Sequence, residues 1–312
     1  HDIIINGITF QYQSLSAIEL KEYDNKIEIR NCDFRNMPFG IHNKGESSSS
    51  DCLIRRALSN KIEISTNNFT DIYRSPIACY PANSKIVDNK ISRVAVLPNV
   101  AEWLNLPRSY DVIDFGNGAA IQTGFNCLIE RNTLDSLGHY GIIPQSNSVI
   151  EKNIINHGCL NYYDCGALYS VYSDSIVTRN NFVTDCAGSI DKGILLTPSM
   201  ANPKIAGNGI YLDYNGDLRF TYVEATGNTI SDCGRGIGFI TTEDFLGQPD
   251  KYGNGFCSPY AVIQNNVLYN NHTEEFGVGA MAIPDINHIP SNFQYEPLQF
   301  TGNSVVHFDE ET

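Results

Sequence analysis

The sequence has few charged residues, and basic ones are the scarcer kind. Charged side chains make up 18% of its 312 residues, with 21 Lys and Arg against 35 Asp and Glu. The net charge of −14 argues against nucleic acid as a partner, because nucleic acids are bound through basic surfaces. It also argues against a polyanionic glycan unless cations intervene, so a neutral glycan is the better fit.

Long helical and apolar segments are missing as well. No amphipathic Glu/Lys/Leu stretch is present, and no apolar run approaches the roughly 20 residues that span a bilayer. We therefore expect no membrane span. Residues 2–5 already read as a strand, with no capping segment or signal peptide before them. Because solenoid ends normally carry a cap, we expect residues 1–312 to be one domain without its N-terminal cap, either processed or a fragment.

The nine cysteines are odd in number and include no CxxC pair. Several recur at similar places in a repeat, which predicts buried thiols that act as small apolar side chains. One or two disulfides stay open, because a sequence alone cannot pair its cysteines. No His or Cys pair has the spacing of a zinc site, and we predict no metal centre of that kind.

A repeat is present instead. An Asn followed two residues later by an aliphatic or aromatic residue recurs at Asn67, Asn89, Asn132, Asn153, Asn180, Asn228, Asn265 and Asn303. A small residue, usually Gly, then leads an apolar strand, at Gly40, Gly118, Gly141, Gly166, Gly188, Gly209, Gly236 and Gly277. Three short strands and three turns require a coil of roughly the length that separates these markers.

Stacked coils explain the repeat. Coils lie about 4.8 Å apart, so one position in each coil lies over the same position in the next. An inward Asn can then bond its amide to the neighbouring coil and form a ladder. We predict an all-β, right-handed parallel β-helix of about eleven coils, its hand following from the chirality of parallel crossovers. Loop insertions interrupt it at 45–58, 99–111, 156–164, 244–259 and 284–297.

The Asn positions and Gly-led strands resemble the pectate-lyase-like β-helix superfamily over nearly the whole chain. Two segments, 164–169 and 209–213, are similar to bacterial β-helix glycoside hydrolases of the α-L-fucosidase and xylanase type. The fold class implies an extracellular, cell-surface or periplasmic protein. The Asn-Thr-Asp, Asp-Asp and Gly-His-Gly motifs of polygalacturonases are absent, as are the Trp-Ile-Asp-His and Arg-x-Pro-x-x-Arg motifs of pectate lyases, which disfavours both chemistries.

Glycoside hydrolysis generally uses two carboxyl groups. Aligning the coils by their Gly residues places Asp213 in one polar column with Gln122, Gln145, Ser170 and Lys192, where Lys192 would keep the carboxylate ionised. Asp164, level with His139, lies six positions away on this alignment. That is too far for a catalytic pair unless the enlarged 156–164 connection closes the gap. Asp191 and Glu243 are the alternative partners, followed by Asp217 and Asp244.

Other side chains are expected to contact the glycan. These candidates are His139, Gln145, His157, Tyr163, Lys192 and Trp103. Each acidic candidate also has an ordinary interpretation: Asp164 as a turn residue, and 213–217 as an acidic turn or a Ca²⁺ site with oxygen ligands. We therefore predict no obligatory cofactor and leave Ca²⁺ open.

Three functions remain open from the sequence. The first is a glycoside hydrolase that uses Asp164 and Asp213. The second is a polysaccharide lyase, which requires a Lys, Arg or Tyr base and usually a cation, and the low basic content counts against it. The third is non-catalytic: an adhesin, a tailspike segment or a structural glycan-binding solenoid.

Overall fold

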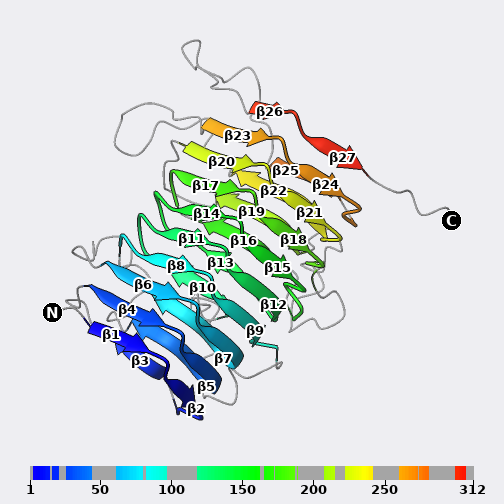
Figure 1. The fold of residues 1–312 in the computed structure, drawn as a ribbon. Coiled ribbons are helices and arrows are strands. Elements are labelled where there is room, and N and C mark those ends of the chain that lie inside the picture. The colour runs from blue at the N-terminus through cyan, green and yellow to red at the C-terminus, as the bar shows by residue number, and fades with distance from the viewer. Residues whose placement is uncertain are drawn as a thin grey trace.

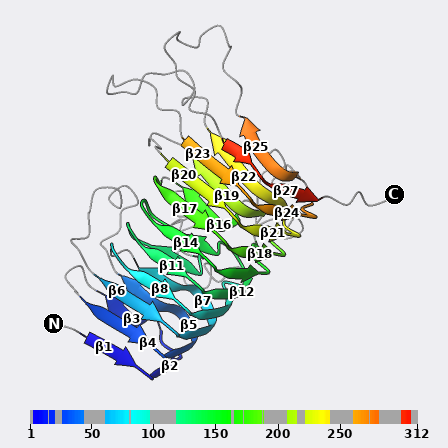
Figure 2. The same cartoon turned by 45° about the horizontal axis from the view of Figure 1, so that its top comes forward.

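The computed structural model describes residues 3–14, 16–20, 26–43, 61–79, 82–96, 118–161, 165–171, 173–186, 188, 207–214, 222–241, 260–272, 274–280 and 299–306. In this part of the chain the regular elements are all β-strands. Every pair of strands is parallel, and each strand lies beside strands one coil earlier and one coil later. The chain therefore winds as a solenoid, with its coils stacked from the N-terminal to the C-terminal end (Figures 1 and 2).

The first face of the solenoid is a ten-stranded sheet. Its strands, in order, are β1 (Ile3–Asn6), β4 (Ile27–Arg30), β6 (Ile62–Ser65), β8 (Lys85–Val87), β11 (Leu128–Glu130), β14 (Val149–Glu151), β17 (Ile176–Arg179), β20 (Tyr222–Thr226), β23 (Tyr260–Gln264) and β26 (Gln299–Thr301).

The other two faces share a seventeen-stranded sheet. The face that follows the Asn positions, called here the ladder face, holds β2 (Thr9–Gln11), β9 (Lys90–Val94), β12 (Thr133–Leu137), β15 (Ile154–Asn156), β18 (Phe182–Thr184), β21 (Thr229–Ser231), β24 (Val267–Tyr269) and β27 (Ser304–Val306). The third face holds β3 (Ser16–Leu20), β10 (Ile121–Thr123), β13 (Ile142–Ile143), β16 (Gly166–Val171), β19 (Asn208–Tyr214), β22 (Arg235–Thr241) and β25 (Glu274–Ala280). Two long strands, β5 (Asp33–Asn43) and β7 (Asn68–Cys79), run along both faces.

A left-handed residue turns the chain at the corner between the first face and the ladder face. The residues with positive φ at this corner are Gly7, Asn31, Thr66, Asp88, Arg131, Lys152, Asn180, Gly227, Asn265 and Gly302. This conformation is costly for most side chains and is tolerated best by Gly, Asn and Asp. In each coil it is followed by the residue that occupies the inward position of the ladder.

The Asn side chains at this position form a continuous ladder. Each Oδ1 accepts the backbone N–H and the side-chain N–H of the Asn one coil earlier, at 2.9–3.0 Å. The ladder runs through Asn67, Asn89, Asn132, Asn153, Asn181, Asn228, Asn266 and Asn303. Cys32 continues it at the N-terminal end, where its backbone N–H donates to Asn67. In the doublets 180–181 and 265–266 the second Asn lies in the ladder, and the first is the left-handed turn residue. In the doublet 67–68 the first Asn lies in the ladder and follows the left-handed Thr66.

The core consists of columns of apolar side chains that point inward. Ile29, Ile64, Ile86, Ile129 and Ile150 pair in register along the first face, and each is at most 1% exposed. On the ladder face the rings of Phe10, Phe34 and Phe69 stack at 5.0 and 4.6 Å. Burying an aliphatic or aromatic side chain of this size contributes roughly 1.5–3 kcal/mol, so the columns hold the coils together from within.

The all-β parallel solenoid predicted from the sequence is confirmed. The first face gives ten coils in the described residues, and the total of about eleven stays a prediction, as does the single domain without a cap. The predicted insertions 45–58, 99–111, 244–259 and 284–297 lie outside the described residues, and of the insertion 156–164 residues 162–164 lie outside them.

Replacement of Asn153 by Ala should destabilise the fold. Its side chain is 1% exposed, bonds to Asn132 and Asn181, and donates to the carbonyl of Ile129. The substitution leaves buried polar groups without partners, which costs roughly 2–4 kcal/mol. The midpoint of urea denaturation, followed by circular dichroism, should fall well below that of Thr133→Ala, an exposed residue one coil earlier. Equal midpoints for the two variants would contradict the role assigned to the ladder.

Candidate functional site

The third face carries a second apolar cluster on its outer side. In β16, Leu168 belongs to the inner core whereas Tyr169 and Val171 belong to this outer cluster. In β19, Ile210 and Leu212 point inward and Tyr211 points outward. The outer cluster, as named here, consists of Ala119, Tyr140, Ile143, Cys159, Cys165, Tyr169, Val171 and Tyr211. Its members are at most 5% exposed although they point away from the inner core.

Stacked rings build the centre of the outer cluster. Tyr140 and Tyr169 stack with their centroids 4.4 Å apart and an interplanar angle of 7°. Tyr211 packs on Tyr169 at 5.1 Å, and His139 on Tyr140 at 3.7 Å. Aromatic pairs contribute about 0.5–1.5 kcal/mol beyond their buried area. Tyr169 is thus held between neighbours on adjacent coils.

Tyr169 holds the carboxylate of Asp213. Its hydroxyl donates a hydrogen bond of 2.8 Å to Oδ2 of Asp213, and both residues are buried, at 2% and 7% exposure. Burial, followed by the neighbouring Tyr140 and the charge of Asp213, raises the pKa of Tyr169 far above its ordinary value. The phenol therefore stays protonated, so it is a permanent donor to Asp213 and no base.

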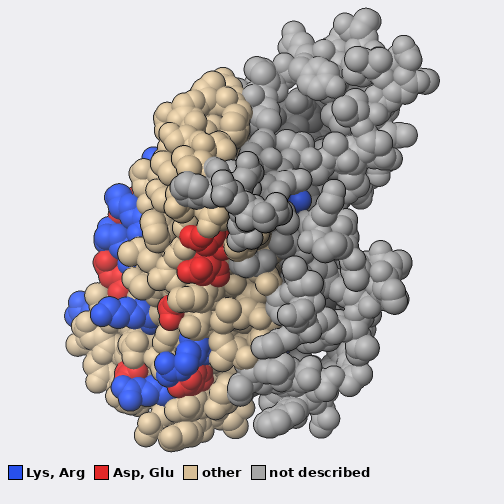
Figure 3. All heavy atoms as spheres, turned by 90° about the vertical axis from the view of Figure 1, so that its right-hand side faces the viewer, with Lys and Arg blue, Asp and Glu red and all other residues tan. Residues whose placement is uncertain are grey.

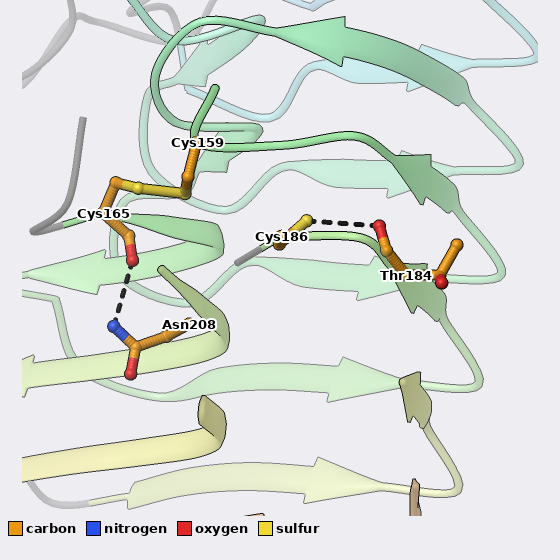
Figure 4. The surroundings of a disulfide bond; sticks show 5 residues. All are labelled: Cys159, Cys165, Thr184, Cys186 and Asn208. Carbon is orange, nitrogen blue, oxygen red and sulfur yellow. Dashed lines mark hydrogen bonds between the residues drawn. A yellow bond between two sulfur atoms is a disulfide. The ribbon is translucent and has the colours of Figure 1, made fainter. Parts of the chain in front are cut away.

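A disulfide fixes the chain beside this pair. Cys159 and Cys165 are bonded across a sequence separation of 6 and are both fully buried. The carbonyl of Cys165 accepts the backbone N–H and the side-chain N–H of Asn208, at 2.8 and 3.0 Å (Figure 4). Asn208 begins β19, the strand that carries Asp213. The disulfide holds Cys165 to Cys159, and the two hydrogen bonds from Asn208 hold Cys165 to the strand that carries Asp213.

The other described cysteines behave as small apolar side chains. Cys32, Cys127, Cys186 and Cys233 are buried thiols that take no part in a disulfide. Burial raises the pKa of Cys127 to about 11, so its thiol is not a nucleophile at neutral pH.

Among the predicted site residues that the structure describes, Asp213 bonds to Tyr169 of the outer cluster, and His139 packs on Tyr140 of the same cluster. Burial lowers the pKa of His139 to about 3, so its imidazole is neutral at ordinary pH. Gln145 is half-buried. His157 is exposed at the corner between the ladder face and the third face, where Nδ1 lies 2.8 Å from Asp135 and Nε2 lies 3.8 Å from Asp185.

Six predicted residues lie outside the described part of the chain: Asp164, Asp191, Glu243, Tyr163, Lys192 and Trp103. The alternatives Asp217 and Asp244 lie outside it too. The candidate Ca²⁺ turn is described only as far as residue 214. In the described residues, no group of three His, Cys, Asp or Glu side chains is placed to hold a metal ion.

The polar column predicted from the Gly alignment is wrong. Asp213 pairs with Val171, and Ser170 pairs with Leu212. Gln122 pairs with Ile143 rather than lying level with Gln145. The register follows the inward aliphatic residues, as in the pair Leu168 and Ile210, and Gly166 lies opposite Asn208. A glycine permits a close approach but has no side chain that would fix its place in the core.

Tyr169 and Tyr211 were missed from the sequence as site residues. The signal was present, because strict alternation along 166–171 places Tyr169 on the face opposite the inward Leu168. An aromatic residue that faces outward in a buried strand is therefore a candidate site residue.

The comparisons with known proteins address the family. A profile described as the right-handed β-helix region matches residues 43–210, more than half of the chain. The chain belongs to this family. The match confirms the predicted hand of the solenoid and supports the broader likeness to pectate-lyase-like β-helices. Neither the curated proteins nor the solved structures give a match.

In the part of the chain that the structure describes, no helix is long and apolar enough to cross a bilayer.

The pH dependence of stability should report on His157. The hydrogen bond that His157 donates to the carboxylate of Asp135 raises the pKa of His157, with smaller contributions from the charges of Asp135 and Asp185. Because the pKa of His157 is higher in the folded than in the unfolded protein, its protonated imidazole stabilises the fold. This contribution is complete below the unfolded-state pKa near 6.5 and is lost as the pH rises through the folded-state pKa. We expect the difference in melting temperature between the wild type and His157→Asn to decrease as the pH is raised from about 5.5 to about 8. Asn also suits the left-handed backbone at this position. A difference that is constant with pH would contradict this ion pair.

Proposed function

We propose that this protein is a carbohydrate-active β-helix enzyme, a glycoside hydrolase acting on a neutral glycan outside the cell or in the periplasm. The observation that carries the proposal is Asp213, a buried carboxylate that a permanently protonated tyrosine orients on an outward face. Glycoside hydrolases pair one such carboxylate, acting as base or nucleophile, with a second carboxyl group that acts as the acid. The α-L-fucosidase and xylanase type suggested by the sequence belongs to this proposal.

The register helps to rank the second carboxyl group. Asp213 pairs with Val171, which follows Asp164 by seven residues, so the observed register lengthens the interval predicted from the sequence. On the other side Asp213 pairs with Ile240, and Glu243 follows Ile240 by three residues. Three residues of chain span at most about 11 Å, which favours Glu243 over Asp164. Asp191 remains a third possibility.

A lyase is a weaker proposal for the same site. β-Elimination requires a base near the sugar, and Tyr169 of the outer cluster does not supply one. Tyr169 remains protonated, because burial raises its pKa. Lysine and arginine are scarce in the whole chain, and a uronate substrate would face a net charge of −14. A neutral substrate avoids that repulsion.

Replacement of Asp213 by Asn should abolish hydrolysis. The amide keeps the shape of the side chain but removes its charge, and loss of a catalytic carboxylate lowers kcat by about 10²-fold or more. The assay is release of reducing ends from a panel of neutral glycans, with absorbance of unsaturated products measured in parallel to detect elimination. The matched control is Asp185→Asn, which should retain activity. Asp185 lies at the corner between the ladder face and the third face, and its side chain is 52% exposed.

The partner is identified by comparing three further variants. Glu243→Gln should lose activity to a similar degree, while Asp164→Asn and Asp191→Asn should lose less. Full activity in a folded Asp213→Asn protein would contradict the hydrolase proposal. Glycan binding without any turnover in the wild type would favour the adhesin or structural alternative.

A further inference from the structure

The C-terminal half of the ladder face presents two outward columns without a charged residue. The first column pairs Ile154, Phe182, Thr229, Val267 and Ser304 in register, one from each of β15, β18, β21, β24 and β27. The second, two residues further along the same strands, pairs Asn156, Thr184, Ser231, Tyr269 and Val306. We call these ten residues the neutral strip.

The same columns are charged in the N-terminal half. There they contain Asp33, Lys90, Arg35 and Asp135, on β5, β9 and β12. Figure 3 views the molecule from this side and shows charged side chains along the left edge, in the lower part and in an acidic patch near the middle of the described surface, whereas the upper part is nearly free of them. The lack of charged side chains is therefore confined to the C-terminal half of these two columns.

The strip also exposes large apolar side chains. Ile154, Phe182, Val267 and Tyr269 are 43%, 44%, 40% and 39% exposed. Contiguous apolar surface with a polar surround marks interaction sites on soluble proteins. The remaining positions are mostly hydroxyl and amide side chains, among them Ser231 and Thr184, which bond to each other at 3.1 Å.

The strip contains two aromatic residues, one in each column. Phe182 and Tyr269 lie on β18 and β24, two coils apart, which is about 10 Å along the solenoid axis. Phe182 lies in the first column and Tyr269 in the second, two residues further along the strands, so the line that joins the two rings runs obliquely across the strip. Two successive sugar rings of an extended glycan span a comparable length.

We propose that the neutral strip is a second glycan-binding surface, which holds an extended uncharged polysaccharide along the solenoid axis. Aromatic rings stack on the C–H faces of sugars, and the hydroxyl and amide groups between them suit a hydroxyl-rich ligand. The charge pattern argues for a neutral partner, because the strip is the charge-free part of a face on a protein of net charge −14. In its ligand class this inference rests on the proposed function, although it involves no catalytic residue.

A second copy of the chain fits the strip less well. The buried centre of an interface between copies is typically more apolar than the surface around it. In the neutral strip, Asn156, Thr184, Thr229, Ser231 and Ser304 make half of the positions polar. A nucleic acid or an acidic polysaccharide would require basic residues, and the strip has none.

The test is affinity electrophoresis in gels that contain soluble xyloglucan, galactomannan or mixed-linkage β-glucan, with polygalacturonate as a polyanionic comparison. The wild type should be retarded by at least one of the neutral glycans and not by polygalacturonate. The double variant Phe182→Ala/Tyr269→Ala should bind about tenfold or more weakly, since aromatic anchors dominate such contacts. Tyr12→Asn, which removes an aromatic residue 74% exposed outside the strip, should bind as the wild type does.

Asp213→Asn separates this inference from the proposed function. It should remain retarded, because the strip does not include Asp213, and the double variant should still cleave short soluble substrates. Unchanged retardation of a folded double variant, or no retardation of the wild type by any neutral glycan, would overturn the inference. So would a double variant that only changes the oligomeric state in light scattering, because the strip would then be a contact between copies.

Discussion

The amide of the ladder asparagine is the interaction on which the rest of this structure depends. Each rung satisfies a backbone N–H and a side-chain N–H of the coil before it, at a buried position where an unpaired polar group is costly. The bonds close only when successive coils lie about 4.8 Å apart and in register. A left-handed residue immediately before the Asn delivers it to the inward position, which is why turn and ladder recur together. Position along the solenoid axis is therefore fixed at one corner of every coil.

A fixed corner leaves the outer faces free to vary. Asn181 and Asn228 are 47 residues apart in sequence, yet their amides bond at 3.0 Å as those of closely spaced rungs do. The chain between them includes β19, with Tyr211 and Asp213, as well as residues outside the described part. Because alternation directs every second side chain outward, the strands that build the core also carry the outer cluster and the neutral strip. Function can thus be added to this fold without disturbing the ladder.

The sequence was sufficient for the fold because its signals came from positions that the ladder constrains. An Asn two residues before an apolar side chain meets a strict requirement in every coil, so it recurs. The Gly residues meet a looser one: Gly141 would bring an added Cβ within 2.3 Å of the carbonyl oxygen of Ala167, whereas Gly166 would meet the side chain of Tyr211. These two residues prevent different clashes, and Gly166 lies opposite Asn208, one residue before Gly209, so alignment by Gly shifted Ser170 onto Asp213. Site residues obey no repeat at all, which is why Asp213 was proposed on weak grounds and Tyr169 was missed.

The two proposed surfaces belong to one continuous sheet, and this has a consequence for how a polymer would be handled. The ladder face and the third face meet at the corner of Ser136, His157, Asp185 and Asp232. A polysaccharide held on the neutral strip would lie on the face next to the one that carries Asp213. The ladder fixes the register of the coils, so the distance between the two surfaces is constant. Tethering of this kind raises the effective concentration of neighbouring chain segments at a second site without any new contact there. Polymer cleavage would then depend on the strip, and cleavage of a short substrate that reaches only the outer cluster would not.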